Sequence, residues 1–306
     1  MSKRDKPLKV GLGVNGKAAH VQQKPMSYWA DVWFRLRKNK AAMVSLVVIL
    51  IVILAAIFAD VIADYETMVI QPDPHNRMAR PSLDNLLGTD QLGRDMLARI
   101  LHGTRYSLSF GLAGATLSLI GGVILGAAAA FFGGKVDNVI TFIVDAIICI
   151  PGMLLALSLV TVMGPGLRNL MIALVISGIP GFTRVVRSIV LGIVREEYIE
   201  AAHAIGVSNP RIIAIHVLPN AISLLIVNMM MSVSGLIMAA AGMSFIGMGI
   251  QPPAPEWGSM LNASMIHLRT NPHTVIFPGL AIVITALSFN LLGDGLSDAF
   301  DPRLKE

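Results

Sequence analysis

The segment of this sequence that comes nearest to a catalytic motif is Gly11-Leu-Gly-Val-Asn-Gly-Lys17-Ala18. It matches the dinucleotide-binding pattern G-x-G-x-x-G and also a phosphate-binding P-loop up to its last position. Both motifs require a strand before the loop and a helix after it, and the P-loop requires a hydroxyl that binds Mg²⁺. Neither a strand nor an apolar helix is predicted here, and Ala18 replaces the hydroxyl. We interpret the match as a coincidence, so any nucleotide chemistry belongs to another chain.

Other groups that could do chemistry are scattered along the sequence. The seven histidines form no H-E-x-x-H motif and show no metal-ligand spacing. The single cysteine, Cys149, excludes a disulfide framework and a Cys-based metal site, and its apolar surroundings predict a small core residue. No G-x-S-x-G nucleophile elbow is present. The sequence therefore predicts no catalytic residue, no metal site and no cofactor.

Asp145 is a carboxylate inside an apolar block. Ionisable residues within the membrane are candidates for function because they are expensive to place there. Asp145 also lies about two helical turns from the predicted inner surface, within reach of an arginine on that side. A functional site and a structural ion pair both remain open for this residue.

The distribution of apolar residues predicts an integral membrane protein. Of the 306 residues, 54% are hydrophobic and 14% are charged, whereas soluble domains carry about 25% charged residues. The net charge of +5 comes from basic residues in the N-terminal tail and in short loops. This pattern indicates orientation in a lipid bilayer rather than binding to nucleic acid. About forty polar residues precede the first apolar block, which is too long for the start of a signal peptide.

Six apolar blocks have the length of about 20 residues that crossing the hydrocarbon core requires. Their glycine, alanine and serine content favours close helix packing, so we predict an all-α bundle. If the N-terminus is inside, 17 of the 24 lysines and arginines fall inside and 7 outside. This asymmetry predicts that both termini are cytoplasmic. The predicted spans are 42–63, 107–132, 138–163, 169–190, 221–249 and 274–293.

A short helix is predicted just before the first span. Ser27 can cap it, Trp29 and Trp33 lie on its apolar side, and a basic cluster follows. Such a helix is typical of the inner headgroup boundary of a membrane. A cytosolic helix that docks on a partner is the alternative interpretation.

The connection from Asp64 to about Tyr106 is predicted to lie outside. Its first half reads as an irregular loop because it is rich in proline. Its second half predicts a short amphipathic helix that is capped by Thr89 or Asp90 and ended by Gly103. We expect this region to act in gating or assembly through Gly88, Asp90, Gly93, Arg94 and Asp95.

The segment 195–220 between the fourth and fifth spans predicts a helix, a break and a second helix. Glu196 to Ile205 is helix-prone, and Gly206 supplies the left-handed residue that ends a helix. Asn209 can cap the next helix with Pro210 at its first position, and Pro219 is predicted to stop it.

Together these signals predict a rigid cytoplasmic knob rather than a flexible loop. The small Ala201 and Ala202 would let a partner approach closely, and Glu200 offers it a charge contact. An ordinary structured loop is the alternative interpretation.

These residues carry a family resemblance. Glu200-Ala201-Ala202, Gly206 and Leu218-Pro219 resemble the EAA signature of ABC-importer permeases, with His216 where the signature usually has isoleucine. Further motifs resemble the C-type permease of oligopeptide, dipeptide and nickel importers, and the likeness covers roughly residues 27 to 306. These motifs are Leu87-Gly-Thr-Asp-Gln-Leu-Gly-Arg-Asp95, Gly247-Met-Gly-Ile-Gln-Pro-Pro253, Glu256-Trp-Gly258, Phe289-Asn-Leu-Leu-Gly-Asp-Gly-Leu296 and Asp301-Pro-Arg-Leu304.

The resemblance implies a type I ABC-importer permease fold in the bacterial cytoplasmic membrane. It implies a homologous second permease, two ATP-binding cassette subunits inside and an extracytoplasmic solute-binding protein. The chain itself would be no enzyme, and its EAA loop would be the coupling helix seated in an ATPase cleft. We divide the chain into a basic tail with the interfacial helix (1–40), the first span with the external segment (41–106) and a five-helix core (107–306).

Two other classes of function remain as alternatives. A proton-coupled secondary transporter usually needs more spans, internal repeats and ionisable residues near the midplane. A membrane-embedded enzyme needs a cluster of catalytic groups that face a cavity. The sequence shows neither pattern, and co-purification of ATPase chains would separate an importer from both.

Overall fold

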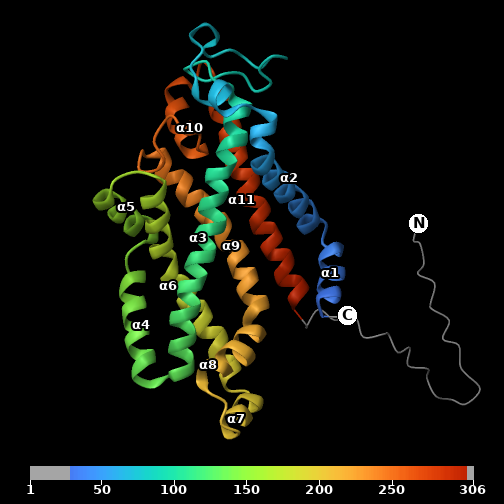
Figure 1. Cartoon of the computed structure of the whole chain (residues 1–306), viewed down its shortest axis with the longest axis vertical. Coiled ribbons are helices and arrows are strands. Elements are labelled where there is room, and N and C mark those ends of the chain that lie inside the picture. The colour runs from blue at the N-terminus through green and yellow to red at the C-terminus, as the bar shows by residue number, and fades with distance from the viewer. Residues whose placement is uncertain (1–27, 302–306) are drawn as a thin grey trace, which may run out of the picture.

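A computed structural model describes residues 28–301, and within this range the chain is helical with no β-sheet. The near-P-loop at 11–18, the proposed cap Ser27 and the end of the last motif lie outside the described residues. Figure 1 shows long helices running side by side, with short helices at both ends of the bundle. The helices are α1 (Tyr28–Lys38), α2 (Lys40–Ile62), α3 (Met96–Phe132), α4 (Gly134–Ile148), α5 (Gly152–Met163), α6 (Leu167–Val194), α7 (Glu197–Ala204), α8 (Asn209–Ile212), α9 (Leu218–Phe245), α10 (Trp257–Ser264) and α11 (His273–Phe300).

Five helices of the described chain are long and apolar enough to cross a membrane, and the α4–α5 pair makes a sixth if it counts as one span. The six apolar blocks are therefore confirmed as helical, but the third is not the continuous span predicted at 138–163. A bend of 83° separates α4 from α5. Pro151 explains the break, because proline lacks an N–H and disfavours a helical conformation for the residue before it. Cys149 lies at this break and is exposed, so the prediction of a core cysteine is wrong for this chain.

The second span begins earlier than predicted. Helix α3 runs without interruption from Met96 to Phe132, so the separate external helix ending at Gly103 is wrong. A Cβ at Gly103 would lie 3.0 Å from the indole of Trp257. Gly103 is therefore required for close approach of α10, not for ending a helix. Asp95 caps α3, whereas Thr89 and Asp90 were the predicted caps.

Small residues let the central helices approach each other, as the sequence predicted. A side chain at Gly122 of α3 would collide with Phe182 of α6, and one at Gly126 would collide with Thr183. A side chain at Gly295 of α11 would collide with Ala42 of α2. These contacts hold α3 against α6 and the first span against the last.

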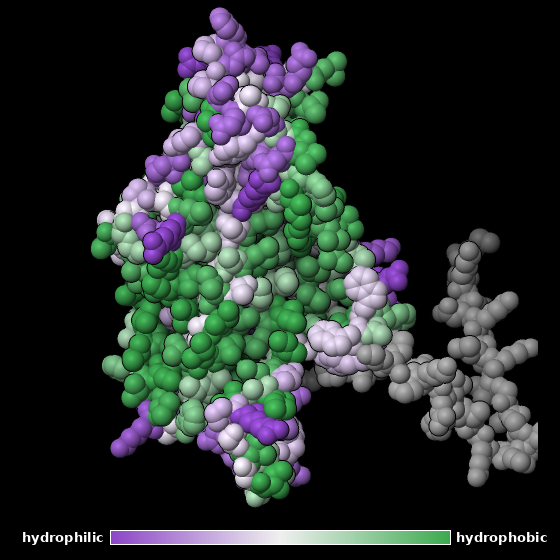
Figure 2. Space-filling model, in the orientation of Figure 1, coloured by the Kyte–Doolittle hydropathy of each residue, from purple (hydrophilic) through white to green (hydrophobic). Residues whose placement is uncertain are grey.

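On the face shown in Figure 2, hydrophobic residues form a broad band across the middle of the molecule, and polar residues gather toward both ends. The segment 64–95 and α10 lie at one end, and α7 lies at the other (Figure 1). The predicted helix before the first span is present as α1, and its Val32 and Leu36 are buried. Trp29 and Trp33 remain exposed.

Helix α1 lies close to the start of α9 and the end of α11. The Tyr28 hydroxyl hydrogen-bonds Ser223 Oγ at 2.9 Å, and its ring stacks on Phe300. The start of α1 and the end of α11 therefore lie toward the end of the bundle that carries the segment between α6 and α9. Six crossings of a membrane require this arrangement. The cytoplasmic location of that end stays a prediction.

Candidate functional site

The segment between α6 and α9 forms a projection at one end of the bundle (Figure 1). Helix α7 has a buried side, with Ile199 and Ala202 packed among apolar residues of α3, α6 and α9. Its other side is exposed and carries Glu200, Ala201 and His203. The structure thus places Glu200 and Ala201 on the free surface of the projection, whereas Ala202 serves as an internal contact.

Helix α7 ends in a Schellman motif built around Gly206. Gly206 has φ of +78°, the left-handed conformation that the sequence predicted. The Gly206 N–H donates to the carbonyl of His203 at 2.9 Å, and the Val207 N–H donates to that of Ala202 at 3.1 Å. A Cβ at Gly206 would meet no heavy atom within 4 Å, so the demand for glycine is conformational and not steric.

The second half of the projection differs from the prediction in two respects. The N-cap of α8 is Ser208 rather than Asn209, with Pro210 in the first turn. Pro219 does not stop the helix, because α8 continues through a π-helical turn, η3 (Ile213–Val217), into α9. In this turn the Leu218 N–H donates to the carbonyl of Ile213, five residues back. This wider turn accommodates a proline that cannot donate its own hydrogen bond.

At the opposite end of the bundle, Asp90 is the centre of a buried ionic network. One carboxylate oxygen accepts hydrogen bonds from the N–H groups of Leu92 and Arg94, at 2.8 and 3.0 Å. The other pairs with the Arg94 guanidinium at 2.7 Å, and Arg99 lies 3.5 Å away. The side chains of Arg94 and Asp90 are 5% and 6% exposed. Asp90 was predicted as a helix cap, but with Arg94 it forms the interior of the external segment.

The remaining residues of this motif shape its backbone. Gly88 and Gly93 both have positive φ, at +75° and +84°. A side chain at Gly93 would collide with the carbonyl of Asp73, so the loop is closed over this position. The Asp95 carboxylate accepts from the Ala98 N–H at 2.7 Å and thereby caps α3. The structure brings all five predicted residues of this motif together as a folded unit.

Helix α10 joins this external unit to the bundle. Its N-cap Glu256 accepts hydrogen bonds from the N–H groups of Gly258 and Ser259, at 2.9 and 2.8 Å. Burial raises the pKa of the Glu256 carboxyl above its ordinary value. Trp257 is 1% exposed and donates its indole N–H to the carbonyl of Ile100 in α3. The Glu256-Trp-Gly258 motif therefore holds α10 against α3.

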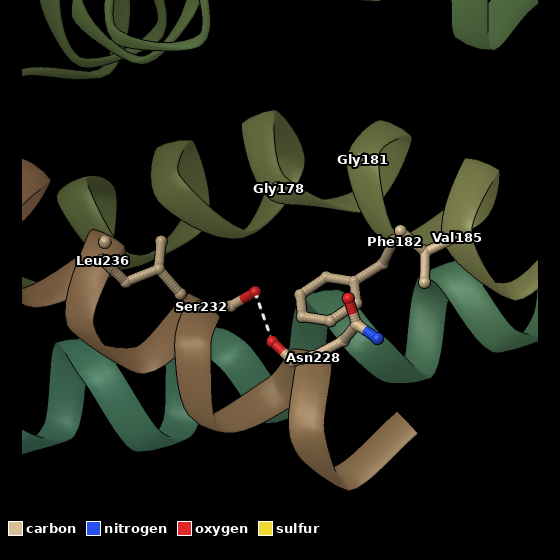
Figure 3. A pocket seen from close by; sticks show the side chains of 8 residues that line it. Gly178, Gly181, Phe182, Val185, Asn228, Ser232 and Leu236 are labelled. Atoms are coloured by element: carbon tan, nitrogen blue, oxygen red, sulfur yellow. Dashed lines mark hydrogen bonds between the residues drawn. The ribbon is translucent and has the colours of Figure 1, made fainter. Parts of the chain in front are cut away.

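A groove lies between α6 and α9, and none of its lining residues was predicted from the sequence. Figure 3 shows Phe182 and Asn228 extending into the space between these two helices, beside Gly178 and Gly181. The central cavity measures about 400 Å³. It is lined by Gly178, Gly181, Phe182, Val185, Asn228, Ser232, Gly235 and Leu236.

Two further cavities extend this space along the helices. A cavity of about 230 Å³ reaches α5 and shares Gly178 and Leu236 with the central one. A cavity of about 320 Å³ extends the other way, shares Val185 and Asn228, and ends at Arg184. We refer to the three connected cavities as the α6–α9 groove.

The glycines of this groove differ from those of the helix contacts. A Cβ at Gly181 or Gly235 would meet no heavy atom within 4 Å, in contrast to Gly122. Their missing side chains are not needed for packing within the chain and leave the groove wide. The sequence contains these glycines, but it does not show that they occupy exposed positions on the helices. The groove could therefore not be predicted from them.

Two ion pairs join α4 to α6 beside this groove. Arg187 binds the Asp137 carboxylate through two hydrogen bonds of 2.5 and 2.6 Å. Arg184 pairs with Asp145 at 2.5 Å through one contact. The alternative in which Asp145 pairs with an arginine is therefore confirmed. No group of three metal-ligating side chains lies together within residues 28–301.

Comparison with known families decides what this bundle is. The family of binding-protein-dependent transport system inner membrane components matches residues 122–306, and the N-terminal TM domain of oligopeptide transport permease C matches residues 27–81. The chain belongs to this family of transport permeases. It is the membrane-spanning permease subunit of an ABC importer, and it is a multi-pass protein of the bacterial inner membrane.

Individual relatives match this permease over most of its length. It is 41% identical to the dipeptide transport system permease protein DppC of Alkalihalophilus pseudofirmus over 284 residues, 93% of each chain. It is 44% identical to the glutathione transport system permease protein GsiD of Pectobacterium atrosepticum over 225 residues, 74% of this chain and 75% of the relative.

A solved structure supports the same fold for the permease. An inward-facing crystal form of the MetNI methionine ABC transporter aligns with a TM-score of 0.56 at 18% identity. The alignment covers 67% of this chain and 98% of the other. The predicted ABC-importer permease fold is therefore confirmed at the level of helix arrangement. Family membership also implies a second permease and ATPase subunits as partners.

Proposed function

We propose that the α6–α9 groove is one wall of a solute pathway that a homologous second permease completes. The groove runs along the apolar part of the bundle and is open on one side. Gly181 and Gly235 keep it wide although nothing in this chain requires them to be small. A facing permease would close the open side and leave a passage between the two chains.

The solutes that fit this pathway are peptides or similar small molecules. The relatives are named for dipeptide and glutathione transport. The middle of the groove carries the uncharged polar groups of Asn228 and Ser232 among apolar residues. Such a lining offers hydrogen bonds to amide groups without holding a solute by charge.

The segment 195–220 is proposed to couple this pathway to two cytoplasmic ATPase subunits. The observation that carries this assignment is the Schellman-ended helix α7, which projects from the bundle yet packs through Ile199 and Ala202 onto it. A conformational change requires a partner that binds two states differently, and a rigid projection can transmit that preference. The external end around Asp90 is proposed to receive a solute-binding protein.

Reconstitution tests the proposal. The permease, its second permease, the ATPases and the binding protein are assembled in liposomes, and ATP-dependent uptake of a labelled dipeptide is measured. We expect uptake that requires the binding protein and stimulation of ATP hydrolysis by loaded binding protein. ATPases that fail to co-purify with the tagged permease would contradict the coupling role, and absence of peptide uptake by an active complex would contradict the solute class.

A further inference from the structure

The two ion pairs between α4 and α6 have different surroundings. Arg187 and Asp137 are 32% and 18% exposed, and Thr141 donates a third hydrogen bond to the Asp137 carboxylate. Arg184 and Asp145 are 58% and 49% exposed and share a single contact. The first pair has the geometry of a fixed clamp between the helices. The second pair is exposed on the surface of this chain.

The position of the exposed pair along α4 and α6 makes a lipid-facing location costly. Asp145 lies eleven residues after the start of α4, which corresponds to a rise of about 16 Å. Arg184 lies ten residues before the end of α6, or about 15 Å. A hydrocarbon core is about 30 Å thick. With the start of α4 and the end of α6 at one membrane surface, both groups lie about midway between the two surfaces. Half-exposed charges at that depth face water or protein, because facing lipid is too costly.

The groove supplies an open surface beside this pair. Arg184 lines the end of the α6–α9 groove together with Ser188 and Asn228. It also lines a second cavity of about 300 Å³ between α4 and α6, to which Asp145 and Thr141 contribute. Arg184 therefore borders both spaces, and Asp145 lines the second of them.

We propose that Asp145 and Arg184 form a charge-pair site on the wall of the solute pathway that contacts zwitterionic solutes. A solute that carried one charge would take the place of one member of the pair and leave the other member without its partner. A zwitterion supplies a carboxylate for Arg184 and an ammonium for Asp145 at once. The site thus selects for solutes with both groups at the moment of passage. This inference rests on the proposed function for the nature of the solute.

Thiol labelling tests the location of the site without reference to any solute. Single cysteines are introduced as Arg184→Cys and Arg187→Cys in a Cys149→Ser background, and the assembled importer is treated with small charged thiol reagents. We expect the cysteine at 184 to react faster than the one at 187, because Arg187 is less exposed although it lines the same cavity. A cationic reagent should react faster than an anionic one, and adding Asp145→Asn should abolish that preference. Absence of reaction at 184 in the assembled complex overturns the site.

Uptake tests the ligand class. Maximal uptake rates of a dipeptide and of its C-terminal amide are compared in the reconstituted importer, so that losses of folding or assembly cancel in their ratio. Arg184→Gln should lower the ratio of the free dipeptide rate to the amide rate at least fivefold, because only the free dipeptide offers a carboxylate to Arg184. Arg187→Gln, the matched control, should affect both equally. An unchanged ratio in Arg184→Gln overturns the zwitterion contact. If the amide is not imported at all, a wild-type rate for the free dipeptide in Arg184→Gln overturns it instead.

The two experiments separate this inference from the proposed function. A wild-type importer that transports no peptide removes the peptide assignment, while the labelling result still decides whether Asp145 and Arg184 face water. If peptides are taken up but the cysteine at 184 does not react, the proposed function is retained and the charge-pair site is contradicted.

Discussion

The Asn220 side-chain amide donates to the Tyr198 hydroxyl at 3.2 Å and to the carbonyl of His216 at 2.7 Å. Tyr198 belongs to α7, and Asn220 belongs to the first turn of α9. The projection is thus joined to a membrane-spanning helix by side chains as well as by the backbone. We therefore expect a displacement of α7 to be passed to α9, which lines the groove.

Gly206 provides the sharpest test of the projection. Gly206→Val should disturb the end of α7, because a β-branched residue is strained at positive φ, by roughly 1–2 kcal/mol or more. Gly206→Asn is the matched control, since asparagine tolerates this conformation and the position has free space. We expect loss of solute-stimulated ATP hydrolysis for the valine variant and near-normal stimulation for asparagine. Equal stimulation in both variants at equal membrane abundance would show that the left-handed turn is not needed.

Glu200 tests the exposed surface of α7. Glu200→Ala removes a charge that makes no contact essential to the fold, so the chain should insert normally. We expect the ATPases to dock more than tenfold more weakly, which corresponds to about 1.4 kcal/mol or more. Retention of ATPase subunits on washed, tagged complexes measures this. Glu200→Asp should retain more of the binding than alanine does, and full retention by alanine would remove Glu200 from the interface.

Arg94 tests the external network. Arg94→Ala leaves the buried Asp90 carboxylate without its closest cation, and breaking a buried pair costs about 3–5 kcal/mol. We expect reduced uptake of every solute and faster proteolysis of the segment 64–95. Arg77→Ala is the control, because Arg77 lies in the same segment but is exposed and donates to the Gln91 carbonyl. A defect confined to one solute would indicate direct solute binding instead.

Glu256 predicts a pH dependence of stability. Because burial raises the pKa of Glu256 in the folded state, the folded chain binds more protons than the unfolded chain between the ordinary pKa and the raised one. Stability should therefore fall as pH rises through this window. Thermal unfolding of the detergent-solubilised complex at several pH values measures the slope. Glu256→Gln should flatten it, and an identical slope in both proteins would assign the dependence to other groups.

Orientation is tested by single cysteines at His75 and Ser208, both of which are exposed in this chain. In a Cys149→Ser background, an impermeant thiol reagent should label position 75 in intact cells and position 208 only after permeabilisation. The basic asymmetry of the loops is the physical reason. Labelling of position 208 in intact cells would reverse the assignment of the two ends.

The sequence was most informative where structure is local. The end of α7 at Gly206 was predicted correctly because a Schellman motif depends on a few neighbouring residues. Gly103 was misread because an exposed turn and a close helix contact both require glycine. Its contact, Trp257, lies 154 positions further along the chain and becomes a neighbour only in the fold.

The effect of each proline also depends on contacts that the sequence does not show. Pro180 and Pro278 lie inside continuous helices, Pro219 is accommodated by a π-helical turn, and Pro151 breaks the third span. Membrane helices tolerate proline where neighbours satisfy the freed carbonyl groups, so hydropathy alone could not separate these cases. The groove was missed for a related reason, because Gly181 and Gly122 look alike in sequence and differ only in what faces them.

The break between α4 and α5 gives the bundle a hinge. A continuous helix can change direction only by giving up backbone hydrogen bonds. Here the bonds of α4 end at the N–H groups of Cys149 and Ile150, and those of α5 begin at the carbonyl of Pro151. Rotation of a few backbone dihedrals at this break would shift α5 against α6, on which Ala156 and Val160 pack, while Arg187 and Asp137 keep α4 fixed to α6. Since α5 lines one end of the groove, its rotation would widen or narrow the passage there.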